Sequence, residues 1–309
     1  MKRMRFVVSL VTLDNDYQVE QAETAQETAQ MLGVDVQILY ADSDAITQSQ
    51  QLLEIIQSRP ESHPTGIILE PAGGTGLPQV AKAAAKAGIA WVVLNRDVGY
   101  ISELRKTYST PLFCVSADNE MIGRIQGNQL ASLLPNGGSA LYIQGPSESV
   151  TAQLRTAGLF ETKGAIEMKL LRAQWTEATS YRAITSWLQL STSRRSRIDL
   201  IAAQNDAMAM GARKAFKEST NAVRNHWLEL PYIGVDGVRK TGLASVKQGL
   251  LRATVIVAPN TRKALEMLAH TLQTGVLPPE MTTTVPVGFP ALEQLRAPYT
   301  TKQYAPSYA

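Results

Sequence analysis

IDLIAAQNDAMAMGARKAF, residues 198–216, joins a short apolar run to a segment whose apolar residues recur at the three- and four-residue spacing of one helix face. This pattern predicts a strand, a turn and a helix. An Asp before a helix accepts hydrogen bonds from the N–H groups of the first turn, so Asp206 is expected to be the N-cap. Two roles remain open for Asn205. It closes the turn, or it reaches a ligand, because ligands of open α/β sheets bind outside the carboxyl ends of the strands.

The same alternation of apolar runs and helical patterns continues along the chain. Strands that alternate with amphipathic helices predict βαβ units on parallel sheets. A first series ends near residue 115, and a second series then begins. The runs typical of strands include 6–11, 34–40, 65–70, 89–94, 111–115, 139–145, 168–174, 198–203, 232–237 and 252–257. The helical patterns include 19–33, 45–58, 77–88, 116–134, 149–162, 180–190, 206–216 and 259–274.

An internal echo relates two of the expected helix starts. DNEM at 118–121, followed by Gly123, resembles NDAM at 205–208, followed by Gly211. In each case a polar pair is expected to cap a helix that carries Met.

The size and composition indicate a globular protein with two domains. The chain has 309 residues, of which 44% are hydrophobic and 18% are charged, and its net charge is +3 at pH 7. This charge is too small and too dispersed to indicate a nucleic-acid partner, and SRRSR at 193–197 is interpreted as a solvated loop. No apolar run approaches the roughly 20 residues that span a bilayer, so the chain is not expected to be embedded in a membrane. The single cysteine, Cys114, excludes an internal disulfide and is expected to be a small buried hydrophobe.

Motifs of catalysis and cofactor binding are absent from the sequence. PAGGTGLP at 71–78 lacks the Lys-Ser/Thr of a phosphate loop and the last Gly of a dinucleotide fingerprint. His63, His226 and His270 are far apart and have no Cys or carboxylate at metal-ligand spacing. There is no Gly-x-Ser-x-Gly elbow. We therefore predict a protein that is not an enzyme and that holds no cofactor and no metal.

The two ends of the chain are interpreted as follows. MKRMRFVVSLV at 1–11 is a first strand rather than the apolar region of a signal peptide. The chain as given then shows no export signal, either because the signal was removed or because there was none. The tail at 296–309 is expected to be loop or partly disordered.

Short motifs carry a resemblance to a known family. They are LNR at 94–96, SADN at 116–119, IQG at 143–145, AAQNDAMAMGA at 202–212 and IGVDG at 233–237. In this order and spacing they resemble the type I periplasmic sugar-binding proteins, the ribose- and galactose-binding family, whose fold is shared by the effector domains of lac-repressor-like regulators. The match runs from about residue 5 to about residue 285.

The resemblance implies two doubly wound, Rossmann-like α/β domains with parallel sheets, joined by a three-stranded hinge. The chain crossings would fall near 115–117, 256–259 and 281–285. The N-terminal domain would comprise 1–115 plus 258–282, the C-terminal domain 116–257 plus 283–295, and the tail 296–309.

In the first domain the resemblance implies ligand contacts from Asn15, Tyr17, Asn95 and Arg96. Tyr17 would lie against a face of the sugar and Asn15 beside it, or else Tyr17 belongs to the core and Asn15 caps the first helix. Arg96 would offer a rigid fork of donors to hydroxyl groups, or would form a surface ion pair. Asn95 stands where the family has Asp, so an amide that both donates and accepts replaces a carboxylate acceptor.

In the second domain the resemblance implies contacts from Gln153, Arg155, Trp175, Asn205 and Asp236. Asn205 would bond a sugar hydroxyl, and Asp236 would accept from hydroxyls or only form the turn VDG. Trp175 would cover the second face of the sugar, or belong to the core. Gln153 aligns with an arginine of the family, whereas Arg155, two residues on, points in another direction on a helix.

The function implied by the resemblance is to bind a small carbohydrate or sugar-like solute in the cleft between the domains and to deliver it to the permease of an ABC importer. The protein would be a periplasmic or extracellular monomer if a signal peptide was removed. The alternative is a cytoplasmic ligand-sensing module with the same fold and no DNA-binding domain. A complete lac-type repressor is disfavoured, because its helix-turn-helix would come before the first sheet and here the first strand starts by about residue 5.

Overall fold

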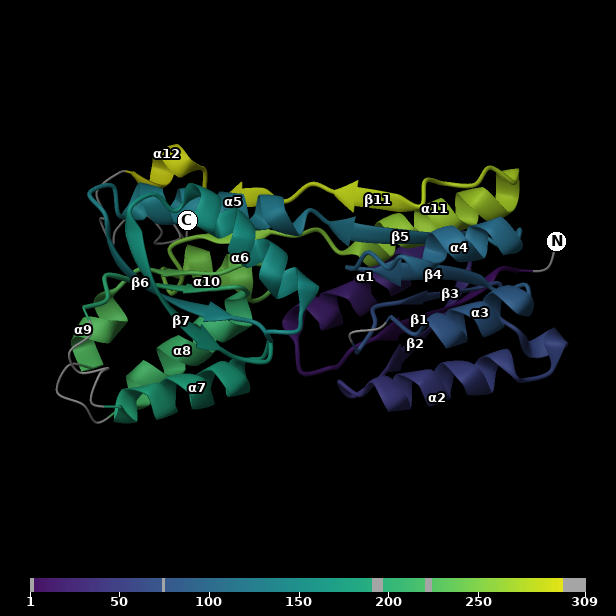
Figure 1. Cartoon of the computed structure of the whole chain (residues 1–309), viewed down its shortest axis with the longest axis horizontal. Helices are drawn as coiled ribbons and strands as arrows, with labels where there is room; N and C mark the ends of the chain where they lie inside the picture. The colour runs from purple at the N-terminus through teal and green to yellow at the C-terminus, as the bar shows by residue number, and fades with distance from the viewer. Residues whose placement is uncertain (1–2, 74–75, 191–196, 220–223, 297–309) are drawn as a thin grey trace, which may run out of the picture. The chain divides into compact units, whose positions relative to one another are not determined.

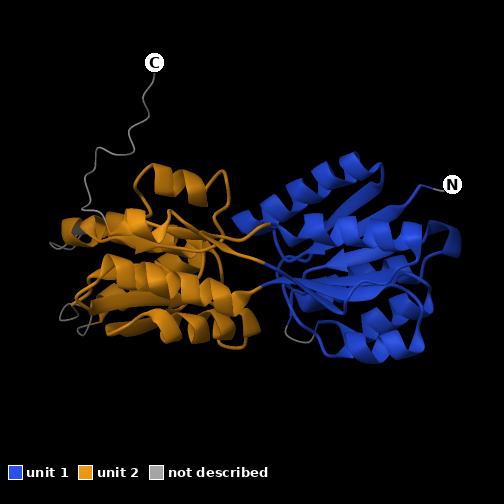
Figure 2. Ribbon diagram, turned by 90° about the horizontal axis from the view of Figure 1, so that it is seen from above, with its two compact units in different colours: residues 1–117, 259–284 blue, residues 118–258, 285–309 orange. Residues whose placement is uncertain are grey.

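The chain forms two compact units in a computed structural model that describes residues 3–73, 76–190, 197–219 and 224–296. Unit 1 comprises residues 1–117 and 259–284, and unit 2 comprises residues 118–258 and 285–309 (Figure 2). Each unit combines a parallel sheet with helices, which confirms the α/β class expected from the sequence.

Unit 1 is built on a parallel sheet with the strand order β11-β5-β4-β3-β1-β2 (Figure 1). The order reverses between β1 and β3, because the chain first adds β2 on one side of β1 and then β3 on the other. Ligands of such sheets bind at this switch point, beyond the carboxyl ends of the strands. The strands are β1 (Arg5–Leu10), β2 (Asp35–Tyr40), β3 (Gly66–Leu69), β4 (Ala90–Leu94), β5 (Leu112–Ala117) and β11 (Met281–Thr284). The helices are α1 (Asp16–Leu32), α2 (Ala45–Ile56), the 3-10 helix η1 (Pro60–Ser62), α3 (Pro78–Lys86), α4 (Tyr100–Thr107) and α11 (Asn260–Thr274).

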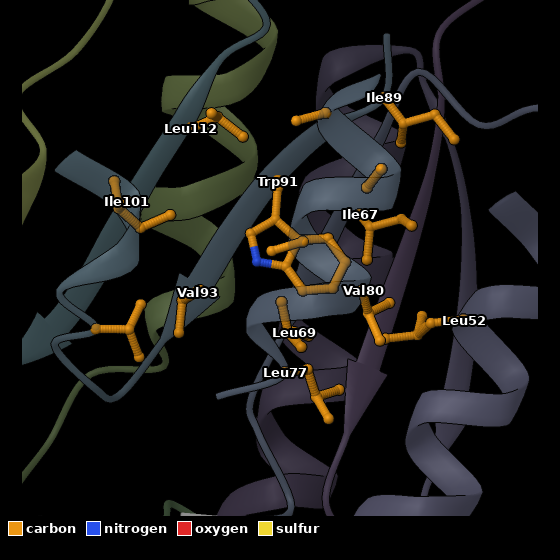
Figure 3. Packing of buried hydrophobic residues seen from close by; sticks show 14 of the residues in the cluster. Leu52, Ile67, Leu69, Leu77, Val80, Ile89, Trp91, Val93, Ile101 and Leu112 are labelled. Atoms are coloured by element: carbon orange, nitrogen blue, oxygen red, sulfur yellow. The ribbon is translucent and has the colours of Figure 1, made fainter. Parts of the chain in front are cut away.

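Both faces of this sheet are buried, which explains its continuous apolar strands. Successive side chains of a strand point to opposite faces. Ile67, Leu69 and Trp91 pack on the face covered by α2, α3 and α4 (Figure 3). Ile68 and Val92 pack on the face covered by α1 and α11. The sheet is therefore a rigid platform whose carboxyl edge presents the turns that follow the strands.

Unit 2 repeats this plan with the strand order β7-β6-β8-β9. Its switch point lies between β6 and β8, because β7 pairs with the outer side of β6 and β9 pairs with the outer side of β8. A short antiparallel pair, β10 and β12, completes the unit. The strands are β6 (Gly138–Gln144), β7 (Ile166–Arg172), β8 (Leu200–Ala203), β9 (Tyr232–Ile233), β10 (Thr254–Ile256) and β12 (Val287–Phe289). The helices are α5 (Asn119–Leu133), α6 (Val150–Thr162), α7 (Glu177–Gln189), α8 (Asp206–Glu218), α9 (Arg224–Glu229), α10 (Gly242–Lys247) and α12 (Leu292–Leu295).

The expectation that Asp206 caps α8 is wrong, because Asn205 is the N-cap. The Asn205 Oδ1 accepts from the backbone N of Met208 at 2.8 Å. Asp206 is the first helical residue, and its carboxylate accepts from the backbone N of Gly237 and from Thr254 Oγ1, each at 2.8 Å. Asp206 therefore ties α8 to the turn after β9 and to β10.

The sequence echo corresponds to a shared structure. Asp118 caps α5 by accepting from Met121 N at 2.8 Å, as Asn205 does for Met208. A Cβ on Gly123 would lie 2.1 Å from the carbonyl O of Arg155, and one on Gly211 would lie 2.2 Å from the carbonyl O of Glu177. Gly123 thus allows α5 to approach the backbone of α6 closely, and Gly211 allows α8 to approach the backbone of α7.

Other expectations have mixed outcomes. Cys114 is 1% exposed, and burial raises the pKa of its thiol to about 12, which confirms a buried hydrophobe. Residues 193–196 of the basic run and 297–309 of the tail lie outside the described residues. Among the helices of the described ranges, none is both long enough and apolar enough to cross a membrane.

Candidate functional site

The turn after β1 places Asn15 and Tyr17 at the carboxyl edge of unit 1. Asn15 caps α1, because its Oδ1 accepts from Tyr17 N at 3.0 Å and from Gln18 N at 3.3 Å. Tyr17 is 8% exposed in the first turn of this helix. The capping alternative for Asn15 is confirmed, and a contact of either residue with a ligand stays a prediction.

Glu70 follows β3 directly and lies on the β3 side of the switch point. Its Oε2 accepts from Gln18 Nε2 at 2.8 Å, from Gln21 Nε2 at 3.3 Å and from Asn95 Nδ2 at 2.6 Å. Burial raises the pKa of the Glu70 carboxyl, while these hydrogen bonds and the charge of Arg96 oppose the rise. One carboxylate therefore connects the start of α1 with the end of β4.

Asn95 continues this network away from Glu70. Its backbone has a φ of 57°, a left-handed conformation that Asn tolerates better than most residues. Asn260 Nδ2 donates to Asn95 Oδ1 at 2.5 Å, and Thr284 Oγ1 donates to Asn260 Oδ1 at 2.8 Å. Asn260 begins α11 and Thr284 ends β11, so both ends of the Asn95 amide are held within unit 1.

Arg96 is half-buried beside this network. Its Nη1 donates to the carbonyl O of Gly73. Burial lowers the pKa of the guanidinium, and the Glu70 charge opposes this shift. The remaining N–H groups of the guanidinium are suited to hydroxyl acceptors.

Arg155 is the centre of the polar cluster in unit 2. Its Nε donates to Asn119 Oδ1 at 3.1 Å and its Nη1 to the carbonyl O of Gln204 at 2.6 Å. The same Nη1 lies 3.6 Å from Asp236 Oδ1, and both side chains are buried. The guanidinium lies over the ring of Trp175, with its Cζ 5.7 Å from the ring centroid. This is the geometry of a cation–π contact.

Trp175 and Asn205 are joined in the same cluster. Asn205 Nδ2 donates to the carbonyl O of Trp175 at 2.9 Å, and the backbone of Trp175 has a φ of 66°. The indole lies against Gly145 at the end of β6, since a Cβ on that glycine would be 2.2 Å from Trp175 Cζ2. Asn205 thus caps α8 and holds Trp175 with one side chain.

The structure brings together Arg155, Trp175, Asn205 and Asp236, whereas Gln153 lies elsewhere. Gln153 is exposed, and its Nε2 donates to the carbonyl O of Ser147 at 2.8 Å. Gln153 and the buried Arg155 are two positions apart on α6, so the two side chains point in different directions.

Glu70 and Gln204 belong to these networks and were not predicted as site residues. Gln204 is fully buried; its Oε1 accepts from Gly145 N at 2.8 Å, and its Nε2 donates to Tyr142 Oη at 3.0 Å. Both residues directly follow apolar strands, in GIILE and LIAAQ. This is the same signal that singled out Asn205, and it would have found them.

A surface pocket of about 360 Å³ lies at the opposite end of the unit 1 sheet. Arg5, Asp35 and Glu54 are among the residues that line it, and none of the predicted site residues is. In the described part of the chain, no group of three or more His, Cys, Asp or Glu is arranged to hold a metal ion.

The family model "Periplasmic binding protein domain" matches residues 6–275. The chain therefore belongs to this family of binding proteins. The D-allose-binding periplasmic protein of Escherichia coli is 27% identical over 82% of this chain and 79% of that protein. The ribose import binding protein of Salmonella typhimurium is 23% identical over 84% of this chain and 81% of that protein.

Solved structures share the fold. An ABC transporter periplasmic solute-binding protein from Actinobacillus succinogenes, with bound D-allose, superposes with a TM-score of 0.78 at 21% identity, covering 95% of this chain and 99% of that one. The Caulobacter myo-inositol-binding protein superposes with a TM-score of 0.75 at 23% identity, covering 94% and 95%. These matches confirm the type I periplasmic binding protein fold expected from the sequence motifs.

Proposed function

We propose that the protein binds a small carbohydrate or sugar-like solute and serves as the solute-binding component of an ABC importer. The observation that carries the proposal is the cluster of Arg155, Asp236 and Trp175 beside the start of α8. A forked donor, a carboxylate acceptor and a flat apolar ring are the groups that the hydroxyls and the C–H face of a sugar require.

Unit 1 supports the proposal with a second polar edge at its own switch point. Glu70 offers a carboxylate and Arg96 offers N–H donors, and the buried Tyr17 lies in the first turn of α1 in the same unit. Both edges are proposed to contribute to binding, which variants in each unit test separately.

The names of the relatives support the role in import, since one is a periplasmic binding protein and another an import binding protein. We therefore propose that the protein acts in the periplasm with an ABC permease as its partner. We also propose that it is a monomer and does not bind nucleic acid.

Thermal unfolding in the presence of D-allose, D-ribose, L-arabinose, D-fructose and myo-inositol tests the binding. A solute that binds only the folded state stabilises it by about 2.7 kcal/mol at 100 times its Kd. At least one of these sugars is expected to raise the Tm, and AMP, as an unrelated solute, is expected to leave it unchanged. A Tm that none of the sugars raises would contradict the proposed function.

Uptake by intact cells tests the importer role separately. Disruption of the gene is expected to abolish uptake of the sugar that binds, and a plasmid copy is expected to restore it. If uptake persists while the purified protein binds the sugar, the ligand-sensing alternative is favoured and the importer role is rejected.

A further inference from the structure

Glu70 is held in place from several sides. Its backbone N donates to the carbonyl O of Ser9 on β1 at 2.9 Å, and its carbonyl O accepts from Gln48 Nε2 at 2.9 Å. Its Oε2 accepts the three amide donors of Gln18, Gln21 and Asn95. The side chain therefore has a single orientation relative to the sheet edge.

The two oxygens of this carboxylate are used unequally. All three amide donors go to Oε2, and Oε1 receives no hydrogen bond from any residue in the described ranges. The residue as a whole is half-buried, and Oε1 is not one of the fully enclosed polar atoms that lack a partner in the described ranges. An ionised carboxylate accepts about four hydrogen bonds, and leaving an oxygen of a buried charge without a donor is costly. Oε1 is thus an oriented acceptor with unused capacity.

Asn95, in contrast to Glu70, has a hydrogen-bond partner for each polar atom of its side chain. Its Nδ2 donates to Glu70 and its Oδ1 accepts from Asn260, so both ends of its amide have partners within unit 1. Its left-handed backbone conformation also costs free energy that surrounding contacts must offset. These contacts make Asn95 a brace between Glu70 and α11.

We propose that Glu70, and not Asn95, supplies the carboxylate acceptor of unit 1, with Oε1 receiving a hydroxyl donor of the solute, and that Asn95 is a positioning residue for Glu70. This inference rests on the proposed function and deepens it. A fixed anionic acceptor selects neutral polyols, which donate O–H groups, over sugar acids and sugar phosphates, whose charges it repels.

The variant Glu70→Gln distinguishes the role of Oε1 from that of Oε2. The new amide oxygen can take the place of Oε2 and keep the three internal donors, while the new NH₂ takes the place of Oε1 and donates where an acceptor is required. With D-allose and myo-inositol as probes, titration calorimetry is expected to show a Kd that rises about 10- to 100-fold for whichever binds the wild type. The matched control is Glu54→Gln, which removes the same charge from the exposed face of α2 and is expected to leave the Kd unchanged.

Asn95→Asp tests the positioning role. A carboxylate at this position would face Glu70 Oε2 across the 2.6 Å that the amide now bridges, so Glu70 is expected to lose its orientation and the Kd to rise. Tighter binding by Asn95→Asp alone would mean that residue 95 contacts the sugar, which overturns the assignment.

The outcomes distinguish this inference from the proposed function. If the wild type binds either sugar and Glu70→Gln binds it equally well, Glu70 is structural and the inference is wrong while the proposed function stands. If the wild type binds neither probe nor any other sugar of the thermal screen, the proposed function fails and this inference fails with it.

Discussion

Arg155 and Asp236 form a buried ion pair in unit 2, with Nη1 3.6 Å from Oδ1, although the two residues come from α6 and from the turn after β9. The same guanidinium covers the ring of Trp175 and bonds the carbonyl of Gln204. A single side chain thus organises the polar edge of this unit.

Arg155→Lys is expected to weaken sugar binding about 10- to 100-fold, because a single ammonium cannot reproduce the fork that reaches Asn119 and Gln204 together. The substitution leaves one of these two buried acceptors without a hydrogen-bond donor, which is also expected to lower the free energy of unfolding by about 1–3 kcal/mol. Calorimetry and urea unfolding measure the two effects. Gln153→Ala, on the exposed side of the same helix, is the control and is expected to change neither. Equal effects of the two variants would remove Arg155 from the site.

Asn205→Asp separates the two bonds of Asn205. The carboxylate still accepts from Met208 N and favours the start of a helix, so the free energy of unfolding is expected to stay within about 1 kcal/mol of the wild type. The donor to the carbonyl of Trp175 is lost, so the turn that carries the indole loosens and the Kd for sugar rises. A variant that binds as tightly as the wild type would show that this bond does not position Trp175.

Gly145→Ala is expected to displace the indole of Trp175, because the new Cβ would overlap Cζ2. The Kd for sugar is then expected to rise and the fluorescence of Trp175 to change, against a constant background from the buried Trp91, Trp187 and Trp227. Gly99→Ala is the control, since a Cβ there meets nothing within 4 Å. Unchanged fluorescence and affinity in Gly145→Ala would contradict a role for the indole in binding.

Glu70 is expected to make stability depend on pH. Burial raises the pKa of its carboxyl above the ordinary value of 4.5, so between 4.5 and the raised pKa the folded state binds more protons than the unfolded state. The unfolding free energy of the wild type relative to Glu70→Gln is therefore expected to be highest below pH 4.5 and to fall as the pH rises through this window. Urea unfolding of both proteins from pH 4 to pH 8 measures the difference. A difference that grows with pH would mean that the hydrogen bonds from Gln18 and Asn95 outweigh burial.

The fold could be predicted because strand and helix periods are local properties of the sequence. The alternation of segments and the burial of Cys114 follow from patterns a few residues long. The cap of α8 lies one position before the expected residue. Asn and Asp are equally good acceptors at an N-cap, and only the position of the first helical turn decides between Asn205 and Asp206.

The polar networks could not be predicted in the same way. The bond between Glu70 and Asn95 spans 25 residues, and that between Gln204 and Tyr142 spans 62. Such partners are brought together only by the order of the strands in the sheet.

Titration calorimetry of the purified wild-type chain with D-allose, D-ribose, L-arabinose, D-fructose and myo-inositol tests the central claim most directly. The account predicts saturable heat from at least one of them with one sugar per chain, and a weaker signal from Arg155→Lys and from Glu70→Gln at the same concentrations. The absence of saturable heat from all five sugars, with a chain that unfolds cooperatively, would contradict it.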